Sequence, residues 1–137
     1  MESRDVESKK SLEYYDCSDR RYGDATVYQE HAMRTVIAQS AEDKLHHGVF
    51  GLASEAGEVA GILQKVYQGH GDPFESDEVK LHLIKECGDC LWMIAEILES
   101  VGYGMGACMK MNIDKLKARY PEGFDPEKSL NRKEGDI

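Results

Sequence analysis

The sequence predicts an all-α fold of antiparallel helices, close in outline to a four-helix bundle. Apolar residues recur every three or four positions between residues 25 and 120, which is the spacing of a helix face. The three prolines lie late in the chain, so residues 24–121 can be helical almost throughout. No segment has comparable support as a strand.

Four helices are expected, and each has recognisable ends. Asp24 is the expected N-cap of the first helix. Glycine and proline predict the loop at residues 69–73 and the break at residues 102–104, and Pro121 ends the last helix. Helices joined by such short connections run antiparallel. The expected ranges are 25–44, 46–67, 77–101 and 105–120.

The chain has 137 residues, which predicts a single domain. Residues 1–22 are polar and are expected to form a flexible arm, residues 23–121 the all-α domain, and residues 122–137 a C-terminal tail. The first residues carry no basic-then-apolar signal, and the four cysteines are too sparse for a disulfide framework. A cytoplasmic protein is expected.

The net charge of −9 excludes several classes of partner. Nucleic-acid polymers and anionic membranes both attract cationic surfaces, so neither is expected to bind. No window approaches the roughly 20 apolar residues of a membrane span. A nucleotide substrate stays open, because clustered carboxylates can hold Mg²⁺ and the metal can then carry phosphates.

Two acidic quartets share one pattern, Glu-x-Gly-acid. They are Glu55-Ala56-Gly57-Glu58 and Glu86-Cys87-Gly88-Asp89. Within each quartet the carboxylates are three residues apart and so lie on one helix face. The midpoint between Gly57 and Gly88 falls in the Asp72-Pro73 loop, so an antiparallel hairpin places both quartets at the same height, roughly 22 Å from the turn.

An interior glycine costs a helix about 1 kcal/mol relative to alanine, so its presence in both quartets needs a reason. We expect Gly57 and Gly88 to let the two backbones approach closely and bring the carboxylates together. Four carboxylates at one level repel each other unless a cation lies between them. Oxygen-only ligands suit Mg²⁺, with Mn²⁺ as a substitute.

The fourth helix is expected to bring polar groups to the same level. Asn112, Lys115 and Arg119 share a face, and the midpoint between Asp89 and Lys115 falls at the Gly102 break. Lys65 follows Glu58 by seven residues on its face. The basic side chains among these could balance the charge of a triphosphate.

In this order, the motifs resemble the MazG-like nucleotide pyrophosphohydrolases, the all-α NTP-pyrophosphatase superfamily. That family's pattern is Glu-x-x-Glu, then Glu-x-x-Asp, then a helix with Asn-x-x-Lys. The match spans about residues 28–132 and includes the Arg119-Tyr120-Pro121 ending; the tail Asn131-Arg132 resembles small phage-type and bacterial members.

The resemblance implies a reaction and an assembly. Such enzymes hydrolyse a nucleoside triphosphate, often deoxy or non-canonical, to the monophosphate and pyrophosphate, and they form homodimers or homotetramers. Carried over, Glu55, Glu58, Glu86 and Asp89 bind Mg²⁺, and Asn112 and Lys115 contact the substrate. Glu55 is the expected base for the attacking water.

Other interpretations remain beside this one. A non-catalytic helical interaction module of the same family is the main alternative. Cys87 and Cys90 have no second pair at zinc-ligand spacing, so buried thiols are favoured over a zinc site. Trp92 is expected in the core, with stacking on a nucleobase as its alternative. His46 and His47 are expected to cap or to face solvent, with a substrate contact as the alternative.

Overall fold

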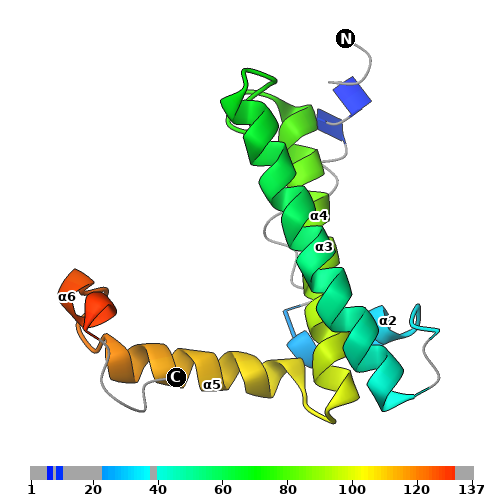
Figure 1. Ribbon diagram of the computed structural model, residues 1–137, viewed down its shortest axis with the longest axis vertical. Helices are drawn as coiled ribbons and strands as arrows, with labels where there is room; N and C mark the ends of the chain where they lie inside the picture. Colours follow the sequence, from blue (N-terminus) through cyan, green and yellow to red (C-terminus); the bar gives the residue numbers. More distant parts are fainter. Residues whose placement is uncertain (1–5, 8, 11–22, 38–39, 132–137) are drawn as a thin grey trace.

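The structure is a computed structural model that describes residues 6–7, 9–10, 23–37 and 40–131 (Figure 1). Most of the predicted arm at residues 1–22 lies outside the described residues, and so does Arg132 of the predicted tail. The predicted all-α class is confirmed, since the described residues contain helices and no strand. The helices are α2 (Ala25–Met33), α3 (Ala41–Tyr67), α4 (Asp77–Ser100), α5 (Met105–Arg119) and α6 (Pro126–Leu130).

The boundary between the first two predicted helices is wrong. We expected helices at 25–44 and 46–67, but α2 ends at Met33 and α3 begins at Ala41. Ser40 explains the early start of α3, because its extended backbone and its hydroxyl, which accepts from the Asp43 N–H at 3.0 Å, form an N-cap. The β-branched run at residues 35–37 disfavours continuation of α2.

An antiparallel hairpin of α3 and α4 forms the centre of the fold (Figure 1). Gly69 and Gly71 both have φ of +86° in the connecting turn, a conformation that favours glycine. The Asp72 carboxylate accepts from the Phe74 N–H, and Ser76 caps the start of α4. The hairpin predicted about Asp72-Pro73 is therefore confirmed.

The two long helices approach most closely at Gly48 and Gly51 of α3. A Cβ added to Gly48 would lie 2.8 Å from Ile97 Cγ1, and one added to Gly51 would lie 2.1 Å from the Met93 sulfur. By contrast, a Cβ at Gly57 or Gly88 would meet nothing within 4 Å. The predicted role of Gly57 and Gly88 is therefore wrong. The close approach of the helices lies one to two turns before Glu55, and beside Gly57 and Gly88 there is free space.

A buried glutamine fixes the shorter helices. The Gln29 side chain of α2 accepts from the Met105 N–H at 2.7 Å and donates to the Tyr103 carbonyl at 3.1 Å. The start of α5 is thereby tied to α2, and α2 in turn packs on α4. None of the helices in the described part combines the length and apolar composition that a membrane crossing requires.

The described chain does not close a four-helix bundle by itself. We expected the last long helix to fold back along its predecessor, but α5 packs on α2 and extends away from the α3–α4 hairpin (Figure 1). Asn112, Lys115 and Arg119 therefore do not reach the level of the acidic quartets within one chain. The tail adds the short helix α6, which Asp125 caps.

Candidate metal centre and adjoining pocket

Three carboxylates from the two long helices converge on one point. Glu55 of α3 meets Glu86 and Asp89 of α4, and one oxygen from each lies within 4.8 Å of the others. The hairpin produces this arrangement, because residues equally far from its turn lie opposite each other. Carboxylate oxygens are ligands that Mg²⁺ and Mn²⁺ prefer, so the group could hold a hard divalent cation.

Glu58, the fourth predicted ligand, lies outside this group and is exposed. Its charge still acts on the group: desolvation, and then repulsion from Glu58, Asp89 and Glu86, raise the pKa of Glu55 above its usual value. The three carboxylates therefore repel one another in the folded chain. A bound cation would relieve that repulsion.

A histidine contacts one of the carboxylates from the preceding turn of α4. His82 Nε2 lies 3.0 Å from Glu86 Oε1. Side chains that hold a metal-binding carboxylate in place often tune its affinity. His82 lies four residues before Glu86, so the helical repeat places both side chains on one face of α4.

The basic residues predicted to bind phosphate are not gathered at the carboxylates within the described chain. Lys65 is exposed in the last turn of α3. Asn112 and Lys115 are exposed on α5, and Arg119 stacks on the Tyr120 ring at 5.9 Å. The prediction placed them by extending the hairpin rule to α5, whose direction depends instead on its contact with α2.

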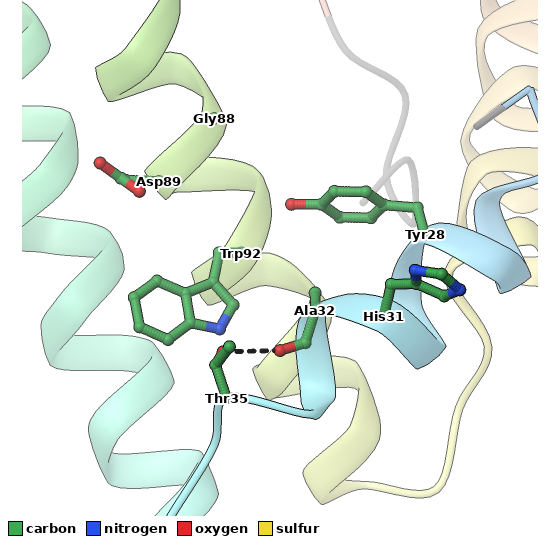
Figure 2. Close-up of a pocket in the computed structure, with 7 residues that line it drawn as sticks. All are labelled: Tyr28, His31, Ala32, Thr35, Gly88, Asp89 and Trp92. Carbon is green, nitrogen blue, oxygen red and sulfur yellow. Dashed lines mark hydrogen bonds between the residues drawn. The ribbon is translucent and has the colours of Figure 1, made fainter. Parts of the chain in front are cut away.

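A cavity of about 650 Å³ adjoins the carboxylates, between α2 and α4. Figure 2 shows the Tyr28 hydroxyl pointing from α2 toward α4, with Trp92 beside Ala32 and Thr35. Burial, and then the negative charge of Asp89, raise the pKa of Tyr28. The residues that line the cavity are Tyr28, His31, Ala32, Thr35, Gly88, Asp89 and Trp92.

The α2 side of this cavity was not predicted. Tyr28 and Thr35 carry no motif, and their approach to α4 follows from tertiary packing between segments about 60 residues apart. Trp92 was predicted only as a core residue with base stacking as the alternative. The sign in the sequence that Trp92 could lie near the site was that it follows Asp89 by three residues.

The chain is similar in sequence to a phage protein. The chain is 28% identical over 111 residues to the Gene 37 protein of Mycobacterium phage L5, which covers 77% of this chain and 96% of that protein. No protein-family profile matches the sequence. No solved structure matches it either.

Proposed function

We propose that this protein is a Mg²⁺-dependent nucleoside triphosphate pyrophosphohydrolase, which converts an NTP or dNTP to the monophosphate and pyrophosphate. The observation that carries the proposal is the convergence of Glu55, Glu86 and Asp89 from two helices. The order of the motifs, which resembles that of the MazG-like enzymes, supports the choice of reaction. The cavity beside Asp89 offers room for a substrate.

The carboxylates divide into two roles under this proposal. Glu55, Glu86 and Asp89 hold the metal, which when bound supplies a polarised phosphoryl oxygen and a more acidic water. A carboxylate that binds metal is a poor proton acceptor. Glu58, outside the group, is therefore a stronger candidate than Glu55 for the base that takes a proton from the attacking water.

The first test is a screen of canonical and modified NTPs and dNTPs with Mg²⁺ or Mn²⁺, in which phosphate and pyrophosphate are read separately. We expect pyrophosphate release from at least one nucleotide. Glu86→Gln and Asp89→Asn should each lower it by at least about 100-fold, since changes to groups that merely support a ligand already cost 10–100-fold.

Glu78→Gln is the matched control, because Glu78 is an exposed carboxylate in the first turn of the same helix. It should leave the rate unchanged. Activity that survives both Glu86→Gln and Asp89→Asn would defeat the proposal. Hydrolysis in ¹⁸O-labelled water would then identify the phosphorus that is attacked.

A non-catalytic helical interaction module is the second candidate, and the apolar surface of α5 favours it. Met109, Ile113 and Leu116 are spaced along one face of α5 and are 54%, 48% and 39% exposed. A module of this kind would bind a partner through that face. It would show no turnover on the nucleotide panel and no stabilisation by Mg²⁺.

The same face supports assembly of the enzyme as a homodimer or homotetramer. Asn112 and Lys115 lie on α5 and cannot contact the carboxylates of their own chain, because α5 points away from the hairpin (Figure 1). In an assembly, α5 of one copy could present these side chains to the carboxylates of another. We propose that the phosphate-binding residues are supplied in this way.

A further inference from the structure

A second cavity, of about 390 Å³, adjoins the first and is not lined by Glu55, Glu86 or Asp89. The two cavities share Thr35 and Trp92, so they meet at the indole ring. Apolar side chains of the segment after α2 form one wall, and α3 and α4 form the rest. The lining residues are Thr35, Val36, Ile37, Asp43, His47, Trp92 and Glu96.

Glu96 lines this cavity and is fully buried, with 0% of its surface exposed. One of its oxygens, Oε2, lies 2.7 Å from His47 Nδ1. The other, Oε1, is buried and has no hydrogen-bond partner among the described residues. A buried carboxylate oxygen without a partner is costly, which points to a ligand that completes it.

Trp92 presents the complementary defect in the same cavity. Its Nε1–H is buried, and within the described part of the chain nothing accepts from it. Two residues that line the cavity, Glu96 and Trp92, therefore carry one unused acceptor and one unused donor beside an aromatic ring. A planar group that carries an N–H donor next to an acceptor atom on one edge would satisfy both, and a nucleobase is such a group.

The spacing of the two sites along α4 fits a nucleotide. Asp89 and Glu96 are seven residues apart, which is two helical turns, so they share a face about 10 Å apart along the axis. That distance is similar to the span between the phosphates of a nucleotide and the far edge of its base. Trp92 lies between them, where the first cavity passes into the second.

We infer that Glu96 and Trp92 form the nucleobase site, in which Glu96 Oε1 accepts from an N–H of the base and Trp92 Nε1 donates to its neighbouring acceptor. The inference rests on the proposed function and names its specificity-determining residues. His47 acts as a positioning residue, since its Nδ1 contacts Glu96 Oε2 at 2.7 Å and leaves Oε1 as the oxygen without a partner among the described residues.

Trp92 is the only tryptophan in the chain, so its fluorescence reports on this cavity directly. The wild-type protein without metal is titrated with nucleoside monophosphates of each base and with ribose 5-phosphate. We expect a saturable change with at least one nucleotide and none with ribose 5-phosphate. This readout does not depend on pyrophosphate release, so failure of hydrolysis and failure of base binding are separate results.

Glu96→Met removes the acceptor and keeps the length of the side chain, while the partner His47 is 58% exposed and can turn to water. We expect the dissociation constant of the preferred nucleotide to rise at least about tenfold. Glu78→Met, on the exposed first turn of α4, is the control and should bind as the wild type does.

Trp92→Phe tests the donor independently, and it can be used if Glu96→Met does not fold. Because this variant has no tryptophan, its binding is measured by calorimetry. It keeps an aromatic ring but loses the N–H, so binding should again weaken. The inference is overturned if ribose 5-phosphate gives the same fluorescence change as the nucleotides, or if no nucleotide binds. It is also overturned if the folded variants bind with unchanged affinity.

Discussion

The behaviour of single residues at the carboxylate site depends on where each lies on the hairpin. Glu55 and Glu58 are one turn apart on α3, yet only Glu55 joins the group with Glu86 and Asp89. The raised pKa of Glu55 records the cost of placing it there without a cation. Its charged form is therefore disfavoured in the folded protein, and under the proposed function a bound cation would offset this repulsion.

Replacement of this residue should separate stability from metal affinity. In Glu55→Gln, the charge that repels Glu58, Glu86 and Asp89 is lost, so we expect a higher melting temperature without metal. The Mg²⁺ concentration needed for half of the stabilisation should rise at least about tenfold, because one ligand becomes neutral. Thermal unfolding with increasing Mg²⁺ measures both effects, and Glu78→Gln is the control.

A lower melting temperature for metal-free Glu55→Gln would contradict this account of the site. So would a response to Mg²⁺ equal to that of the wild type.

At the scale of elements, the contact between α3 and α4 explains why the site is open. The close approach at Gly48 and Gly51 lies toward the start of α3, and the carboxylates lie beyond it, where the glycines have free space beside them. The sequence predicted the hairpin and its turn correctly, because loop residues and helical periodicity are local signals. It could not assign the packing glycines, because four interior glycines of α3 look alike until α4 is placed.

Paired alanine substitutions test this difference. Gly48→Ala should destabilise the protein by about 1–3 kcal/mol, since the new Cβ would crowd Ile97 and the Met93 carbonyl oxygen at 3.2 Å. Gly57→Ala should stabilise it by about 1 kcal/mol, since Gly57 is exposed in the middle of a helix. Denaturant unfolding at equilibrium measures both.

Equal effects from the two substitutions would show that α3 and α4 do not cross where the structure places the crossing.

For the whole molecule, the direction of α5 is the main departure from the predicted bundle. The sequence indicated a helix at 105–120 and the structure has it at Met105–Arg119, so its existence was predictable from the pattern. Its direction was not, because it depends on Gln29 and on the packing of α2, which the short Gly102–Gly104 segment does not specify. The buried polar groups of Glu96 and Trp92 were not predicted either, because their surroundings also depend on how the helices pack.

The apolar face of α5 predicts self-association. We expect the protein to sediment as a dimer or tetramer in analytical ultracentrifugation. Ile113→Glu should shift it toward the monomer, because a charge buried between copies without a partner is strongly unfavourable. Ala118→Glu places the same charge on the opposite, exposed face of α5 and should leave the assembly intact.

Circular dichroism should show equal helicity for both variants, so that a loss of assembly is not mistaken for unfolding. A wild-type chain that sediments as a monomer at micromolar concentration would contradict the prediction.

The buried amide of Gln29 also bears on cooperativity. The side chain extends from α2 and hydrogen-bonds to the first peptide group of α5. The helix α2 lines the first cavity, and α5 carries the surface proposed for assembly. A tilt of α5 on joining another copy would therefore be transmitted to that wall through the Gln29 side chain and through the packing of α5 on α2. Occupancy of one subunit and the strength of the subunit contact would then be thermodynamically coupled, each changing the other by the same factor.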